Sequence, residues 1–312
     1  MTGADTGNCT RAQPCATATY AVGRLAATRT HLVFAAGTYA HCFEIGHDDT
    51  NAPSVEIHGG GATFASDCND GAELLLADVP VIIHDATFDG NSTQSNAIQC
   101  GAAHCEAYRL QFAQAGSFSV GAETVLHDVQ FANSFTSAIY LQSGSHLTAD
   151  RVQIAGGDEG IVAGNTGTSS VDISNLLVYG TSGIALDIVF AQGMIRASTI
   201  ADNGLHMNQA PYSLKCGSNL TVESSILWNR LGNYAPISGT CAFVETIAGP
   251  SYDSSSTLDE DPTFVAPVSY DYHLQAGSPA IDQVTIGPDT DLDGVARPQG
   301  ASYDIGAYEY KP

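Results

Sequence analysis

The chain has 312 residues, and 44% of them are hydrophobic, which excludes a disordered polypeptide and allows a large buried core. Its 33 acidic residues outnumber its 10 lysines and arginines, and the resulting net charge of −23 makes nucleic acid or an anionic membrane an unfavourable partner. No apolar run approaches the length of a membrane span, and no signal peptide is recognisable, so we expect a soluble protein.

Eight cysteines are spread along the sequence, and an even number favours disulfides formed in an oxidising compartment. The absence of any Cys-x-x-Cys pair makes a structural zinc site the weaker interpretation. Pairing of sequence neighbours predicts the disulfides Cys9–Cys15, Cys42–Cys68, Cys100–Cys105 and Cys216–Cys241. We therefore expect an exported protein.

The first predicted element is an amphipathic helix over residues 16–27, ATATYAVGRLAA. A strand and a turn follow in THLVFAAGTYA. A solenoid must cover its exposed core at each end. We therefore expect residues 1–50 to form a helical N-terminal cap together with the first strand.

From residue 59 onward, short segments recur around one apolar anchor. Positions two and five before the anchor are mostly apolar and position four is mostly polar, which is the alternation of a β-strand. The pattern also predicts a one-residue corner near Asp85, Arg109, Asp128, Arg151 and Asn175. The anchors are spaced 19 to 27 residues apart and are Phe64, Phe88, Phe112, Phe131, Ile154, Val178, Ile200 and Leu227.

A second strand series lies between these segments. Two strand series in each period of about 22 residues indicate a chain that coils, each coil stacking on the last at roughly 4.8 Å. The inward residues of this series are expected to be Ile98, Phe118, Ile139, Ile161, Ile184 and Leu205. A sandwich does not explain the steady period, and a propeller needs about twice that period.

The fold class predicted is therefore all-β: a single-stranded parallel β-helix, right-handed by the default of crossover connections. Residues 51–250 would form the coils. Residues 251–312 would form a C-terminal cap, and the whole chain, 1–312, one domain.

Two segments carry a resemblance to a known family. NCTRAQPCATATYAV and HLVFAAGTYA resemble the N-terminal region of secreted right-handed β-helix proteins of the pectate-lyase-like superfamily. DEDPTFVAPVSYDYHLQAGSPAIDQ and DTDLDGVARPQGASYDIGAYEY resemble the choice-of-anchor Q segment of bacterial surface β-helix proteins. The resemblance implies secretion or cell-surface display and a polysaccharide or cell-surface glycan as partner. It does not imply one reaction, because a fold does not fix a function.

The C-terminal segment is expected to cover the last coil. Its apolar and aromatic residues would provide that cover: Tyr270, Tyr272, Leu274, Ile281, Ile305, Tyr308 and Tyr310.

The same segment contains the oxygen spacing of a calcium loop at Asp289, Asp291 and Asp293. The twelfth position of such a loop is usually a glutamate, and here it is Gly300. The alternative is an acidic turn in which Asp293 pairs with Arg297. The expected cofactor is therefore none, or calcium.

Candidate chemistry lies on the outward face of the second strand series. One outward column reads Gln99, Ser119, Tyr140, Val162, Ala185 and His206, and the next reads Gly101, Gly121, Gln142, Gly164, Asp187 and Asn208. These columns place Asp187, His206 and Asn208 together on two adjacent coils. Asp158 and Glu159 occupy the turn just before one of these strands.

Glycoside hydrolysis is one reaction that this set could support, because it needs two carboxyl groups about 5–9 Å apart. Asp187 could act with Asp158 or Glu159.

Elimination from a uronic acid is the other reaction, and it needs a base and groups that neutralise the substrate carboxylate. His206 or Tyr140 could be the base, Asn208 and Gln142 could bind the carboxylate, and Lys215 is an alternative basic group. The scarcity of cations in the chain disfavours this reaction.

A non-catalytic surface protein remains the alternative, used for adhesion or glycan binding with the coil as a rigid spacer. The chain lacks the paired aspartates with Gly-His-Gly of polygalacturonases, and it lacks an Asp-Pro-His-Asp motif. An outer column also contains His84 and His127, but two coils separate them by roughly 9–10 Å. That separation is too large for one zinc ion.

Overall fold

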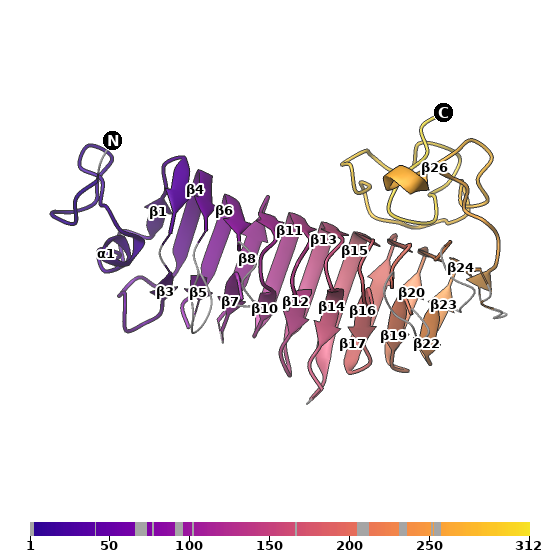
Figure 1. The fold of residues 1–312 in the computed structure, drawn as a ribbon, viewed down its shortest axis with the longest axis horizontal. Coiled ribbons are helices and arrows are strands. Elements are labelled where there is room, and N and C mark those ends of the chain that lie inside the picture. The colour runs from indigo at the N-terminus through magenta and orange to yellow at the C-terminus, as the bar shows by residue number, and fades with distance from the viewer. Residues whose placement is uncertain are drawn as a thin grey trace.

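The computed structural model describes residues 3–40, 42–65, 74–76, 78–90, 96–101, 103–165, 167–204, 212–230, 236–250, 252 and 257–312. Its strands stack side by side along one long axis, from β1 near the N-terminus to β24 (Figure 1). Nearly every strand pair is parallel, so the all-β parallel β-helix is confirmed.

Sixteen of the described strands form one sheet that wraps two sides of each coil. They are β1 (His31–Val33), β2 (Gly37–Tyr39), β4 (Val55–Phe64), β6 (Val81–Asp89), β8 (Cys105–Tyr108), β9 (Gln111–Ala113), β11 (Glu123–Ala132), β13 (His146–Ala155), β15 (Ser169–Tyr179), β17 (Ala191–Arg196), β18 (Thr199–Ala201), β20 (Leu220–Glu223), β21 (Ile226–Trp228), β23 (Ala242–Val244), β24 (Thr246–Gly249) and β25 (Thr257–Leu258). All the predicted anchors lie in register in this sheet.

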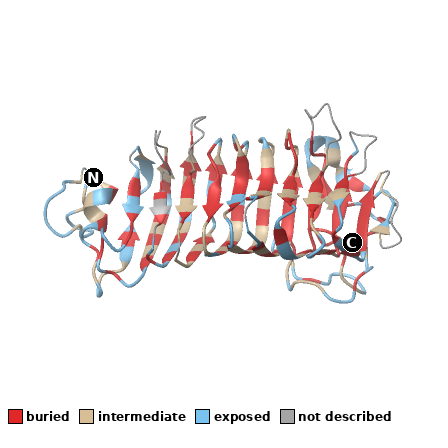
Figure 2. Cartoon of the chain, turned by 90° about the horizontal axis from the view of Figure 1, so that it is seen from below, coloured by how far each residue is buried: buried red, intermediate tan, exposed pale blue. Residues whose placement is uncertain are grey.

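The aromatic anchors stack inside the coil. The ring of Phe112 lies 5.1 Å from Phe88 and 4.5 Å from Phe131, centroid to centroid, and the planes of each pair are nearly parallel. Figure 2 shows the buried residues as stripes along the strands, which is the burial pattern of an apolar interior. Close contact between stacked side chains of one kind on successive coils stabilises the repeat.

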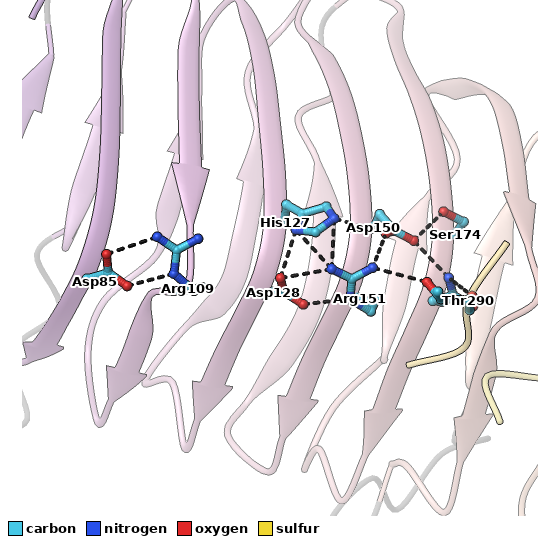
Figure 3. Close-up of polar contacts among 9 residues, drawn as sticks. Asp85, Arg109, His127, Asp128, Asp150, Arg151, Ser174 and Thr290 are labelled. Atoms are coloured by element: carbon cyan, nitrogen blue, oxygen red, sulfur yellow. Dashed lines mark hydrogen bonds and ion pairs between the residues drawn. The ribbon is translucent and has the colours of Figure 1, made fainter. Parts of the chain in front are cut away.

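The predicted one-residue corners are confirmed. Asp85, Arg109, Asp128, Arg151 and Asn175 have φ between +50° and +59°, the left-handed conformation that turns the chain between the two sides of the sheet. Ion pairs join neighbouring corners: Arg109 donates to both Asp85 oxygens at 2.7 and 2.9 Å, and Arg151 to both Asp128 oxygens at 2.6 and 2.9 Å (Figure 3).

The remaining side of each coil is a nine-stranded sheet. Its strands are β3 (Phe43–Ile45), β5 (Leu74–Leu76), β7 (Ile98–Cys100), β10 (Phe118–Val120), β12 (Ser137–Leu141), β14 (Glu159–Ala163), β16 (Leu186–Ile188), β19 (Leu214–Cys216) and β22 (Ile237–Gly239). Four of the predicted inward residues pair on successive coils in the expected register: Ile98, Phe118, Ile139 and Ile161.

The predicted register of this sheet is wrong at the next coil. Ile161 pairs with Leu186, two residues beyond the expected Ile184. Ser182 and Gly183 bond to the preceding turn through their amides, so the turn continues and the strand starts later. The next expected inward residue, Leu205, lies outside the described residues.

The N-terminal helix is shorter than predicted. Helix α1 spans Ala18–Val22, with the Thr17 hydroxyl accepting from the Tyr20 amide at its start and Gly23 at its end. Ala18 and Val22 are buried in the same core as the first strands, so α1 does cover the start of the coil.

The C-terminal segment lies beside the coils rather than over their end (Figure 1). It contains β26 (Phe264–Ala266), the short 3₁₀ helix η1 (Pro267–Ser269) and β27 (Asp271–Leu274). Its apolar residues pack on the outer face of the sixteen-stranded sheet, against Leu177, Ile226 and Ile247. The prediction that this segment covers the last coil is therefore corrected to a lateral cover over several coils.

Three of the predicted disulfides are present: Cys9–Cys15, Cys100–Cys105 and Cys216–Cys241. Cys42 is also disulfide-bonded, and its predicted partner, Cys68, lies outside the described residues. Among the described residues there is no helix of the length and apolarity that crossing a bilayer requires.

Candidate functional site

The outer face of the nine-stranded sheet carries a charged pair on adjacent coils. In register, Tyr140 is followed by Val162, Asp187 and Lys215. Lys215 Nζ donates to Asp187 Oδ2 at 3.1 Å, and each side chain is about one-third exposed. Asp187 therefore lies in the Tyr140 column, and not in the Gln142 column that the sequence predicted, because the register moves by two residues at β16.

A third charged group, Glu159, begins β14 and lies within electrostatic reach of this pair. Burial raises the pKa of its carboxyl, and the negative charges of Asp158 and Asp187 raise it further, while the Lys215 ammonium opposes the shift. A carboxyl in this setting keeps its proton to a higher pH than an exposed glutamate does.

Asp158 supports the turn that precedes β14. Its Oδ1 accepts from the Ser182 hydroxyl at 2.9 Å, and its carbonyl accepts from the Gly183 amide at 2.8 Å. Because these bonds connect two successive coils, Asp158 fixes the position of Glu159 beside it.

Tyr140 and Gln142 are placed on the N-terminal side of the cluster. Tyr140 is 38% exposed, and its hydroxyl lies over Gly164, where an added Cβ would approach it to 3.0 Å. Gln142 Nε2 donates to Ser119 Oγ at 2.9 Å, toward the preceding coil. Tyr140 thus shares a column with Asp187, whereas Gln142 belongs to the column beside it.

His206 and Asn208 lie outside the described residues, so the set Asp187, His206 and Asn208 stays a prediction. The contact that sequence reasoning missed is Asp187 with Lys215. A signal for it existed: Leu-Asp-Ile at β16 and Leu-Lys-Cys at β19 share the same apolar, charged, apolar pattern.

The cluster of Glu159, Asp187 and Lys215 has the parts for acid/base chemistry. One carboxyl holds a proton more strongly than usual, and another faces an ammonium group. Glycoside hydrolysis uses two carboxyl groups, one of which donates a proton.

The predicted calcium ligands of the C-terminal segment are engaged with different partners. Asp291 is 1% exposed, and its two oxygens accept the amides of Val295 at 2.8 Å and Glu309 at 3.0 Å. Asp293 Oδ2 contacts His273 Nε2 at 3.0 Å, and Asp289 accepts the Arg297 amide through its carbonyl at 2.9 Å.

The geometry bears on one of the two interpretations of this segment, the acidic turn. Asp293 pairs with His273, whereas the acidic-turn interpretation suggested Arg297 as its partner. Within the described ranges, the one set of three histidine, cysteine or carboxylate ligand atoms closer than 4.8 Å to one another lies elsewhere. Calcium binding here stays a prediction.

A cavity of about 490 Å³ opens beside the C-terminal segment, lined in part by His273, Asp291, Asp293 and Glu309. Burial lowers the pKa of His273, but the hydrogen bonds and charges of Asp293 and Asp271 outweigh burial and raise it. This acidic cavity is a second polar site, separate in sequence from the cluster on the nine-stranded sheet.

Comparison with known proteins supports the fold. No protein-family model matches the chain, and no curated protein matches its sequence. The crystal structure of pectate lyase Pel9A matches it with a TM-score of 0.53 and 13% sequence identity, over 99% of this chain and 96% of that one. At this identity the similarity concerns the architecture alone.

Proposed function

We propose that this protein acts on a polysaccharide that lies across the nine-stranded sheet, and that it hydrolyses a glycosidic bond. The observation that carries the proposal is the Asp187–Lys215 pair on adjacent coils, with Glu159 at the start of β14 within electrostatic reach of it. The architecture shared with a pectate lyase supports a polysaccharide as the substrate class. The net charge of −23 favours a neutral glycan over a polyanionic one.

In this proposal Glu159 is the general acid. Its raised pKa keeps it protonated at higher pH, so that it can donate a proton to the departing glycosidic oxygen. Asp187 is the second carboxylate, which activates a water molecule or attacks the sugar carbon. Lys215 holds the Asp187 carboxylate in one orientation through the 3.1 Å hydrogen bond.

Elimination is the second candidate reaction, and Lys215 favours it. An ammonium group on this face could neutralise the carboxylate of a uronic acid, and the protein with the matching architecture is a pectate lyase. Lys215 already faces Asp187, however, so a substrate carboxylate would compete with that carboxylate. Tyr140, in the same column, is then the candidate base.

Disulfides and the architecture support export, and we propose secretion or surface display. The C-terminal segment would belong to the surface-anchor type that its sequence resembles.

The test is a depolymerisation screen of the purified protein on xylan, β-glucan, polygalacturonate and alginate. New reducing ends without new ultraviolet absorbance would support hydrolysis, whereas unsaturated products would establish elimination instead. Glu159→Gln and Asp187→Asn should each abolish hydrolysis.

Asp172→Asn is the matched control, since Asp172 is an exposed carboxylate paired with Arg196 on the other sheet. Activity unchanged in Glu159→Gln would overturn the assigned mechanism. Binding without either product would support the non-catalytic alternative.

A further inference from the structure

Four polar side chains gather on the outer face of the first strands, far along the chain from the cluster described above. They are His31 of β1, Glu56 and His58 of β4, and His84 of β6. The parallel register places His31 beside Glu56 and His58 beside His84. Buried residues alternate with all four, so the side chains point away from the core on the same side.

Three of these residues converge on one point. His31 Nδ1 lies 3.2 Å from His58 Nε2 and 3.3 Å from Glu56 Oε2, and His58 Nε2 lies 3.2 Å from Glu56 Oε1. Zinc bonds to imidazole and carboxylate are about 2.0–2.2 Å long, and a tetrahedron of such bonds separates neighbouring ligand atoms by roughly 3.3–3.5 Å. The ligand atoms are already spaced as in a metal site.

We propose that His31 Nδ1, His58 Nε2 and the Glu56 carboxylate bind a divalent transition metal ion, with Zn²⁺ as the representative. Two imidazoles and one carboxylate are a donor set that suits zinc and copper, whereas calcium and magnesium prefer oxygen ligands alone. The fourth position faces solvent, since the His31 side chain is 57% exposed, and water or a small anion can complete the coordination.

A chain of contacts behind these ligands orients the carboxylate. His84 Nε2 lies 3.3 Å from Glu56 Oε1, and His84 Nδ1 lies 2.6 Å from Asp85 Oδ2. Arg109 in turn holds Asp85 through two hydrogen bonds. Such outer contacts fix the orientation of a metal ligand and are typical of metal sites in proteins.

The close approach of the two coils keeps His58 and His84 together. A Cβ added to Gly59 would lie 2.4 Å from the Asp85 carbonyl oxygen, so only glycine fits where β4 and β6 meet at the corner. The rings of His58 and His84 accordingly make an edge contact at 4.3 Å between centroids. The backbone therefore fixes the spacing of His58 and His84 across β4 and β6.

The experiment is calorimetric titration of the chelator-treated full chain with ZnCl₂. We expect one site, which a large excess of CaCl₂ does not displace. His31→Ala and His58→Ala should each weaken binding at least tenfold, and His84→Ala by about 10–100-fold, the usual effect of losing an outer contact. His47→Ala is the control and should bind as the unaltered chain, because His47 is exposed and its backbone amide, not its ring, donates to Asp78.

Co²⁺ gives a second readout, because its visible absorption reports coordination geometry. A four-coordinate spectrum in the unaltered chain that is lost in His58→Ala would support the site. Unchanged zinc affinity in the His31→Ala/His58→Ala double variant would overturn it, as would displacement by calcium at equal concentration, which would indicate diffuse binding to the acidic surface.

Discussion

Arg297 Nη1 and Glu309 Oε2 lie 3.5 Å apart, and neither side chain exposes any surface. The guanidinium also donates to the carbonyls of Asp304 at 3.1 Å and Gly306 at 2.7 Å. Glu309 accepts the amide of Gln299 at 2.9 Å. This pair organises the C-terminal segment from within, because it connects three stretches of irregular backbone that have few strand contacts of their own.

Removing one partner of this pair should therefore strongly lower the free energy of unfolding. Arg297→Met leaves the Glu309 carboxylate buried without its cation, which costs about 3–5 kcal/mol of unfolding free energy. The double variant Arg297→Met/Glu309→Met should be more stable than Arg297→Met alone, because it also removes the Glu309 carboxylate that the single variant leaves without its ion-pair partner. Urea unfolding of the three proteins measures this, and equal stability of the single and double variants would contradict the assigned coupling.

The outer face of the sixteen-stranded sheet changes from polar to largely apolar where the C-terminal segment covers it. One outward column begins with polar residues and becomes largely apolar under the segment: Gln111, Gln130, Gln153, Leu177, Thr199, Ile226 and Ile247. Ile226 is fully buried there.

We predict that Ile226→Ala destabilises the docked segment by about 2–5 kcal/mol, the usual cost of such a cavity. Trp228, the only tryptophan, lies in the same apolar cluster, so its fluorescence reports undocking in urea. Gln130→Ala, in the same column on an uncovered coil, should change stability by less than about 0.5 kcal/mol. Equal effects of the two substitutions would argue against specific docking.

The pH dependence of cleavage should follow Glu159. Burial and the charges of Asp158 and Asp187 raise its folded pKa above 4.5, so the acid form, and with it the rate, is lost as pH rises through that higher value. Asp158→Asn removes a negative neighbour and should move this alkaline limb to lower pH. Lys215→Met removes the opposing cation and should move it to higher pH; shifts of the opposite sign in the pH–rate profiles would exclude Glu159 as the acid.

The corner pair of Asp128 and Arg151 should stabilise the fold at neutral pH and not in acid. Burial raises the pKa of Asp128, but the hydrogen bond and charge of Arg151 and the charge of His127 outweigh burial and lower it. A lowered folded pKa gives stability that is present above the unfolded value near 3.8 and is lost as pH falls toward the folded value.

Arg151→Met should therefore cost about 1–2 kcal/mol at pH 7, after allowance for the partial exposure of Asp128, and little at pH 2. Arg196→Met is the matched control. Arg196 and Asp172 are both about 40% exposed or more, and such a pair is worth about 0–1 kcal/mol. Thermal unfolding at both pH values decides the prediction, and a loss that is the same at pH 2 would rule out the Asp128 ion pair as its cause.

Most of the coil could be predicted from the sequence, because each coil repeats the same pattern of apolar inward residues and polar outward residues. Phe64, Phe88 and Phe112 recur at one spacing, and the one-residue corner near Asp85 follows from the break in alternation. The register failed where the chain reads Ile-Ala-Leu-Asp-Ile, from residue 184 to 188, since apolar residues occupy both strand faces there. The period alone does not resolve such a segment.

The sequence suggested some members of the candidate site. Asp187 was expected on the outward face and Glu159 in the turn before a strand, but the contact of Asp187 with Lys215 depended on the register that failed. The cluster of His31, Glu56 and His58 was not predicted, because the recognisable repeat starts at the glycines that follow His58. The lateral position of the C-terminal segment rests on contacts between residues more than 100 apart, such as Asn175 with Thr290, and no local pattern encodes those.

The C-terminal segment also limits where coils can be added to the β-helix or removed from it. It bonds to several coils at once, through Thr290 to Arg151 and Asn175, and through Ala307 to Thr199 (Figure 3 shows the first of these). Duplicating or deleting a coil within this stretch would shift those partners by about 4.8 Å per coil and break the docking. Coil number can therefore vary only on the N-terminal side of β13, so the rod can be lengthened from one end and is fixed in length at the other.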